Sequence, residues 1–87
     1  MRHLSAEQLL LVADEFCAHH RVAIVDYAAI CAAASITGGQ FEGVPVHRTI
    51  VSARASLERA ITALMPLNQR NQEFAVVAGE VFARVNS

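Results

Sequence analysis

The feature that most constrains the fold is Pro66, which separates two stretches whose apolar residues recur at intervals of three and four. Residues at this spacing share one face of an α-helix, and proline ends a helix because it lacks a backbone N–H and clashes with the preceding turn. We therefore predict a helix that begins near His47 and ends at Leu64 or Met65. A second helix should follow over residues 71–85 after a tight connection. The predicted apolar faces are Ile50, Ala53, Leu57, Ala60, Ile61 and Leu64 in the first helix and Phe74, Val77, Ala78, Val81, Phe82 and Val85 in the second.

A capping box predicts another helix near the N-terminus. Ser5 supplies a hydroxyl for the first turn, and Gln8, three residues later, supplies an amide that can reach back to it. This helix should run to about residues 18–20. Its predicted apolar face consists of Leu9, Val12, Ala13, Phe16 and Cys17.

The remaining segments complete the predicted architecture. Asp26 is placed to cap a short helix over residues 27–35, after a connector at 21–25 that has β character. Residues 37–45 form the one real loop, which contains three glycines and a proline. The sequence thus predicts an all-α fold of four helices with short connections, in a single domain that spans residues 1–87.

The high apolar content predicts contact with another protein chain. Of the 87 residues, 54% are hydrophobic and none is tryptophan. A domain of this size buries a modest fraction of its surface, so one small core cannot hide all of these side chains. We expect a homo-oligomer or a protein partner to cover the excess. The candidate interface residues are Leu10, Leu11, Ala29 and Ala33.

The charge pattern narrows the class of partner. The net charge is −1, and all seven basic residues are arginines that are spread along the chain among the acids. Proteins that bind nucleic acid usually gather positive charge on one face, so we do not expect such a partner.

The sequence has neither the apolar length of a membrane span nor a signal-peptide pattern, which favours a cytoplasmic protein. Cys17 and Cys31 are expected to be reduced and buried.

The junction between the last two helices, Met65-Pro66-Leu67-Asn68-Gln69-Arg70-Asn71-Gln72-Glu73-Phe74-Ala75, resembles the signature region of the Fic/Doc family. The family pattern is His-Pro-Phe-x-Asp-Gly-Asn-Lys-Arg followed by a helix. The resemblance extends to residues 1–9, similar to the opening of Doc-type toxins, to the glycine loop, and to residues 75–87, similar to the helix after the motif. It implies the helical Fic fold and a transferase that moves a nucleotidyl or phosphoryl group from ATP to a protein hydroxyl.

Position by position, the groups that carry the family's chemistry are absent. Met65 stands in place of the general-base histidine, and Gln69 stands in place of the carboxylate that holds a metal. Arg70 replaces the motif glycine, Gln72 replaces the lysine, and Glu73 replaces the arginine that binds phosphate, which reverses the charge. The positions that match the family are Pro66, Leu67 and Asn71.

These losses predict a protein that binds instead of one that catalyses. A general base contributes about 10²–10⁴-fold in rate, and a carboxylate facing a phosphate repels it. We therefore expect no enzyme activity, no cofactor and no metal. The resemblance then implies a catalytically inactive Doc/Fic-like protein that acts through protein–protein contacts in a bacterial or phage toxin–antitoxin setting.

Other hypotheses remain open at this point. The junction can be an ordinary joint between two helices of an unrelated Ala-rich domain. An active transferase with a rearranged site would need Glu42 or Glu73 together with His47. A small DNA-binding repressor could use the last two helices, although the final helix offers little positive charge. A metal site that combines residues 19–20 with His3 or Cys17 is a further hypothesis, against the simpler view of two exposed histidines at a helix end.

Overall fold

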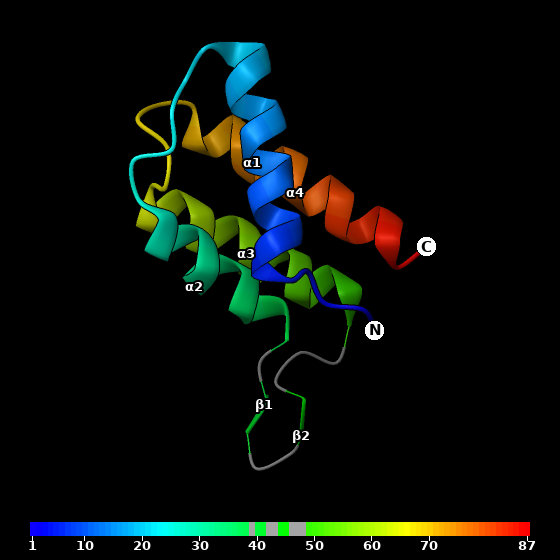
Figure 1. The fold of residues 1–87 in the computed structure, drawn as a ribbon. Coiled ribbons are helices and arrows are strands. Elements are labelled where there is room, and N and C mark those ends of the chain that lie inside the picture. The colour runs from blue at the N-terminus through cyan, green and yellow to red at the C-terminus, as the bar shows by residue number, and fades with distance from the viewer. Residues whose placement is uncertain (39, 42–43, 46–48) are drawn as a thin grey trace.

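The computed structural model describes residues 1–38, 40–41, 44–45 and 49–87, with backbone alone for 40–41 and 44–45. This part of the chain contains four α-helices and one short hairpin, which confirms the predicted all-α fold (Figure 1). The elements in chain order are α1 Ala6–His20, α2 Tyr27–Thr37, β1 Gln40–Phe41, β2 Val44–Pro45, α3 Ile50–Leu64 and α4 Asn71–Val85.

The first two helices begin at the caps that the sequence predicts. The Ser5 hydroxyl accepts the backbone N–H of Gln8 at 3.1 Å, and the Gln8 side chain accepts the N–H of Ser5 at 2.9 Å. The Asp26 carboxylate accepts the N–H of Ala29 at 3.1 Å. Each cap satisfies backbone donors that the first turn of a helix leaves without an intrahelical partner.

The third helix starts at a cap that the sequence analysis did not identify. The Thr49 hydroxyl accepts the N–H of Ser52 at 3.0 Å, and α3 begins at Ile50. The predicted start near His47 falls outside the described residues. A threonine three residues before a serine is a weak signal in sequence, because the reciprocal Glu or Gln of a capping box is missing.

Helix α2 extends two residues past its predicted end. Thr37 is buried, and its hydroxyl accepts the backbone N–H of Leu4 at 3.0 Å while it donates to the carbonyl of Ala34. This tertiary hydrogen bond to a residue 33 positions away in sequence holds the last turn in place. Local patterns carry no information on such a contact.

The loop expected at residues 37–45 contains an antiparallel hairpin. Strands β1 and β2 pair with Gln40 opposite Pro45 and Phe41 opposite Val44. Two-residue strands are too short to show an alternating pattern, so only a loop could be predicted here.

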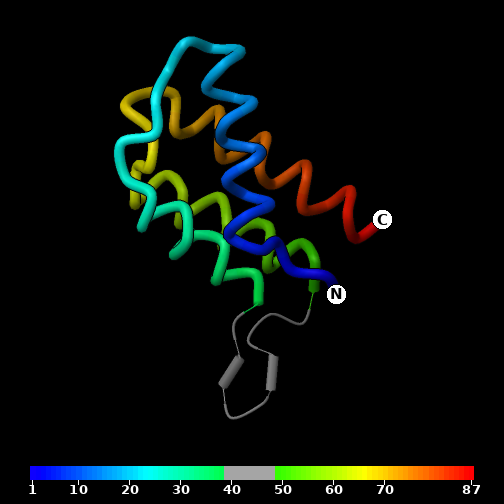
Figure 2. Tube along the Cα trace, viewed as in Figure 1, coloured from blue at the N-terminus to red at the C-terminus, as the bar shows by residue number. Residues whose placement is uncertain are grey.

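Helix α3 lies between α2 and α4 and packs extensively on both (Figures 1 and 2). Helix α1 packs on α2, and it contacts α4 over a much smaller area. The chain ends lie close together because Asn86 bonds to both backbone groups of Arg2, accepting its N–H at 2.6 Å and donating to its carbonyl at 2.8 Å. The largest fully buried side chains are Phe74, Phe82, Leu4, Leu9, Ile30, Leu57, Ile61, Leu67 and Pro66.

Candidate functional site

The α3–α4 junction is fastened to the α1–α2 connector by backbone hydrogen bonds. The carbonyl of Pro66 accepts the N–H of Val25 at 2.8 Å and that of Asp26 at 3.2 Å. Next to it, Ile24 and Leu67 form an isolated antiparallel bridge, in agreement with the β character predicted for the connector. The motif region is therefore built from two segments about 40 residues apart in sequence.

Two asparagines complete this attachment. Asn68 donates its backbone N–H to the carbonyl of Ala23 and accepts the Ala23 N–H on its side chain, both at 3.0 Å. Asn71 accepts the N–H of Leu67 and donates to the Leu67 carbonyl, both at 2.9 Å. Asn68 thus bonds to both backbone groups of Ala23, and Asn71 bonds to both backbone groups of Leu67. Both asparagines therefore stabilise the turn. No role was predicted for Asn68, because an amide in a tight connection is its only signal in the sequence.

The turn itself uses left-handed backbone at two residues other than glycine. Met65 closes α3 with φ 48° and ψ 64°, and Arg70 precedes α4 with φ 63° and ψ 29°. This conformation is favoured by glycine and disfavoured for side chains that carry a Cβ. The Met65 side chain is 60% exposed, so burial does not compensate for the strain.

The other polar side chains of the junction are exposed. Gln69 and Gln72 are exposed, and the Arg70 guanidinium pairs with the Glu73 carboxylate at 3.1 Å. Both partners of that pair are about half exposed, so the pair contributes little to stability. Of the eight motif positions, Pro66 and Leu67 are buried and act in packing.

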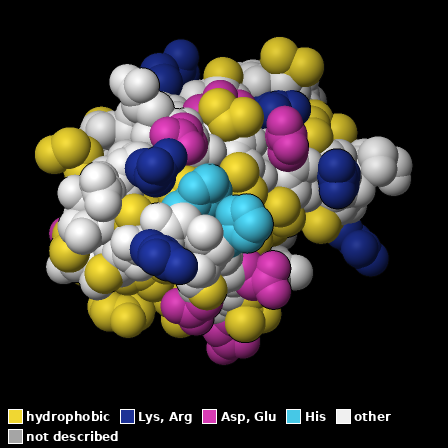
Figure 3. Space-filling model, turned by 90° about the horizontal axis from the view of Figure 1, so that it is seen from above, with side chains coloured by type: hydrophobic (Ala, Val, Ile, Leu, Met, Phe, Trp, Pro, Cys, Tyr) yellow, Lys and Arg dark blue, Asp and Glu magenta, His cyan; other side chains and the backbone are white. Residues whose placement is uncertain are grey.

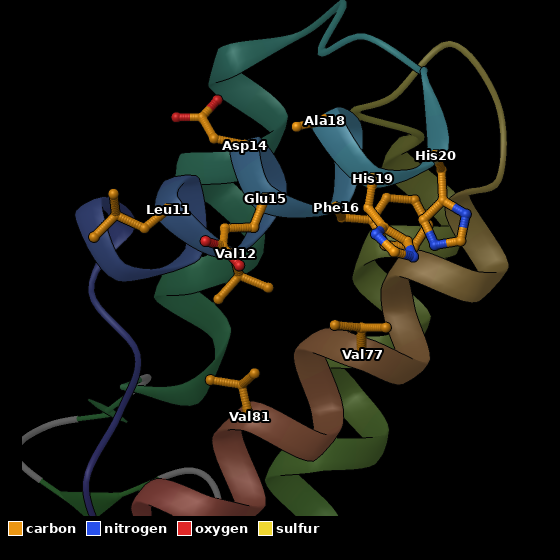
Figure 4. Close-up of a pocket in the computed structure, with 10 residues that line it drawn as sticks. All are labelled: Leu11, Val12, Asp14, Glu15, Phe16, Ala18, His19, His20, Val77 and Val81. Carbon is orange, nitrogen blue, oxygen red and sulfur yellow. The ribbon is translucent and has the colours of Figure 1, made fainter.

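A shallow groove lies between α1 and α4 (Figure 4). In the close-up, Val12, Glu15 and His19 extend from α1 toward Val77 and Val81 of α4. The lining consists of Leu11, Val12, Asp14, Glu15, Phe16, Ala18, His19, His20, Val77 and Val81. The groove follows from the small contact area between the two helices, which leaves apolar side chains half-covered.

Aromatic rings close the end of the groove at the C-terminus of α1. The Phe16 ring is nearly buried and lies 4.2 Å from the His20 ring and 5.5 Å from the Phe74 ring, measured between centroids. The His19 and His20 rings meet edge to face at 5.1 Å. In the space-filling view, histidine side chains gather at the centre of this face, with apolar, acidic and basic side chains around them (Figure 3). His20 thus packs on the core, which the sequence analysis did not foresee.

The structure corrects two of the four predicted interface residues. Ala29 and Ala33 are buried, at 4% and 0% exposure, inside this chain's own core and are not available to a partner. Leu11 is 66% exposed and Leu10 is partly buried, so both remain candidates. The exposed face of α2 is offset by one residue from the predicted one and consists of Tyr27, Ala28, Cys31, Ala32 and Ser35.

Some residues predicted to be core are more exposed than expected. Leu64 is exposed, and Val77, Val81 and Val85 are half-buried at the edge of the core. For Val77 and Val81 the reason is that their flank of α4 lines the groove. The buried residues of α4 are Phe74, Ala75, Ala78, Gly79 and Phe82.

Both cysteines are free thiols, but the prediction that both are buried is wrong. Cys17 is half-buried, and Cys31 is exposed because it lies on the outer face of α2. Burial raises the pKa of the Cys17 thiol, and the nearby Asp14 carboxylate raises that pKa further. Cys17 is therefore held as the neutral, poorly nucleophilic thiol.

Within the described ranges, no group of three or more His, Cys, Asp or Glu side chains is arranged to hold a metal ion. The hypothesis of a site at residues 19–20 therefore gains no support from geometry. Among these same residues, no helix has the length and apolar character needed to cross a bilayer.

We found no match to this chain among family models, curated proteins or solved structures.

Proposed function

We propose that the chain is a catalytically inactive Doc/Fic-like protein that acts through contacts with other proteins, in the cytoplasm and in a bacterial or phage toxin–antitoxin setting. The observation that carries the proposal is Met65. Its exposed thioether stands where the family has a histidine, and a thioether does not take up a proton at neutral pH. The missing general base is worth about 10²–10⁴-fold in rate.

The surrounding residues support the same proposal. Asn71, the polar motif residue that matches the family, uses its amide to hold the turn at Leu67. Glu73 pairs with Arg70 and presents a carboxylate where the family binds phosphate. The Asn71 amide therefore serves the stability of the junction, and the Glu73 carboxylate would repel the phosphates of the family's donor.

The α1–α4 groove is the surface that supports binding. Its apolar side chains Val12, Val77 and Val81 are only partly covered, and Glu15 extends among them without an ion pair or hydrogen bond in the described part of the chain. A groove between two helices fits a third amphipathic helix. The carboxylate favours a helix whose polar edge carries lysine or arginine.

Neither rival hypothesis gains an observation in its favour. Glu42 and His47, which a rearranged transferase would need, lie outside the described residues. For a DNA-binding repressor, the exposed charges of α4 are Glu73, Glu80 and one arginine, Arg84, which is no basic stripe.

The first test is for transfer from ATP. The protein is incubated with ATP, magnesium and a lysate that supplies protein hydroxyls, and adducts are sought by intact-mass and peptide mass spectrometry. We expect no adduct and no ATP binding by calorimetry. Met65→His serves as the matched variant, and it should remain inactive because it restores the base without the phosphate-binding groups. Any adduct formed by the wild-type protein would contradict the proposal.

The second test addresses the groove. Two synthetic amphipathic helices share one apolar face, and their polar faces carry either lysine or glutamate. Fluorescence anisotropy should show that the lysine peptide binds and the glutamate peptide does not. Val77→Asp should abolish binding, whereas Val51→Asp, at an exposed position on α3, should leave it unchanged. Equal losses from both variants, or no binding of either peptide, would exclude the groove as the contact surface.

A further inference from the structure

Two histidines line one end of the α1–α4 groove, and their surroundings differ. The His20 ring is half-buried and packs on Phe16, with 4.2 Å between centroids. The His19 ring meets the His20 ring edge to face at 5.1 Å and is exposed. In the close-up, His19 extends from α1 toward Val77 and Val81 (Figure 4). The His19 imidazole is therefore the more accessible of the two to a helix bound in the groove.

Two carboxylates share the α1 wall of the groove with His19. Glu15 lies four residues earlier, which places it one turn away on the same face of the helix, and Asp14 precedes it. No ion pair or side-chain hydrogen bond involves Glu15, Asp14 or His19 in the described part of the chain. While His19 is neutral, both carboxylates are available to a basic partner.

The elements that pack on α1 bring no charge to the groove. Helix α2 contains no acidic residue, arginine, lysine or histidine. From α4, the lining residues are Val77 and Val81. The charged residues of α4 are not among the described residues that line the groove; they are Glu73, Glu80 and Arg84. Glu73 pairs instead with Arg70 of the junction. The charge of the groove is therefore set by α1.

We propose that His19 regulates which helices the groove accepts, because a proton taken up from solvent by its imidazole weakens the binding of a basic helix. This inference rests on the groove as the contact surface proposed above. Histidine is the side chain that ordinarily changes charge between about pH 5 and pH 8, whereas carboxylates ordinarily stay ionised there. Protonated His19 places a positive charge in the groove, where it repels the lysine or arginine of the occupant.

Protonated His19 also competes for the carboxylate that a basic helix would use. An acidic residue followed four residues later by a cation is the favourable order for an ion pair along a helix. Glu15 and His19 have this order, so the imidazolium pairs with the Glu15 carboxylate and neutralises it. Repulsion and competition act in the same direction, and acidification therefore weakens a basic occupant.

Peptide binding at two pH values tests the proposal. Fluorescence anisotropy at low salt, at pH 7.5 and pH 5.5, measures the affinity of the lysine helix used in the groove test. We expect its dissociation constant to rise about three-fold or more at pH 5.5, an effect of the size that exposed charges produce. A peptide with the same apolar face and glutamine in place of lysine should change little, because it carries no charge for His19 to repel.

Three histidine variants locate the titrating group. His19→Gln should remove the pH dependence, because the amide is polar but does not take up a proton in this range. His20→Phe should retain the dependence, since a ring still packs on Phe16. His3→Gln, at a histidine outside the groove lining, is the matched control and should also retain it. Circular dichroism at both pH values separates a change in affinity from a loss of folded protein.

The outcomes distinguish this proposal from that of the groove itself. A lysine helix that binds equally well at both pH values would overturn the role of His19 and leave the groove as the contact surface. A pH dependence that survives in His19→Gln, or a loss of binding that follows unfolding at pH 5.5, would also overturn it. Failure of the lysine helix to bind at either pH would contradict both proposals.

Discussion

The two flanks of α4 differ in how completely they are covered. On one flank, Phe74 and Phe82 are fully buried, and Gly79 lets the Arg54–Glu58 ion pair of α3 lie against the helix. Toward α1, valines of the same helix remain half-exposed in the groove. The apolar content of the chain is therefore not covered evenly: one flank of α4 completes the domain's own core, and the other flank stays partly exposed.

The largest expected effect separates the two flanks directly. Phe82→Ala should lower the free energy of unfolding by about 3–5 kcal/mol, because it removes a fully buried ring and leaves a cavity. Val81→Ala, one residue away and half-buried, should cost less than about 1.5 kcal/mol. Urea denaturation followed by circular dichroism measures both. Similar losses for the two variants would mean that α4 has no open flank.

The next largest expected effect on the free energy of unfolding comes from the α3–α4 junction. Asn71→Ala should cost about 1–3 kcal/mol, because it leaves the partly buried N–H and carbonyl of Leu67 without their partner. Gln72→Ala, at the adjacent exposed position, should change the stability by less than about 0.5 kcal/mol. If Asn71→Ala is as mild as Gln72→Ala in thermal denaturation, the amide does not hold the turn.

Gly79→Ala tests how closely the α3 flank is packed. A Cβ on Gly79 would lie 2.5 Å from Glu58 Oε1 and 2.9 Å from Arg54 Nε, so the carboxylate must move and the ion pair must open. The pair is partly exposed, and alanine favours the helix by about 1 kcal/mol. We therefore expect a net change within about 1 kcal/mol. A loss of several kcal/mol would show that the side chains cannot move, and a crystal structure of the variant would locate the obstruction.

The smallest effect concerns the half-covered side of α1. Since folding raises the pKa of the Cys17 thiol, this group contributes stability at neutral pH that is lost as the pH rises through the raised pKa. Asp14→Asn should lower the midpoint of Cys17 alkylation against pH only in part, because burial is the larger cause. Glu7→Gln, a more distant carboxylate on α1, serves as the control. An alkylation midpoint that Asp14→Asn leaves unchanged would remove the carboxylate from the explanation.

The sequence by itself determined the four helices and most of their ends. The Ser5–Gln8 box, the Asp26 cap and Pro66 act within a few residues of the backbone that they control, so a local pattern is sufficient to find them. The same holds for the centres of the apolar faces, such as Leu57 and Phe74. The identity of the motif positions also comes from sequence, and the function drawn from them stays a prediction.

Only the tertiary structure decided which apolar side chains are covered. In α2 the run from Ala28 to Ala33 is apolar on every side, so periodicity could not tell Ala29, which is buried, from Ala28, which is exposed. Contacts with α1 and α3 make that choice. The groove beside Val77 and the hydrogen bond between Ala23 and Asn68 likewise depend on segments distant in sequence. Which side chains are buried depends on contacts between helices that are distant in sequence. A single sequence predicts these contacts only where a helix has one apolar face and one polar face.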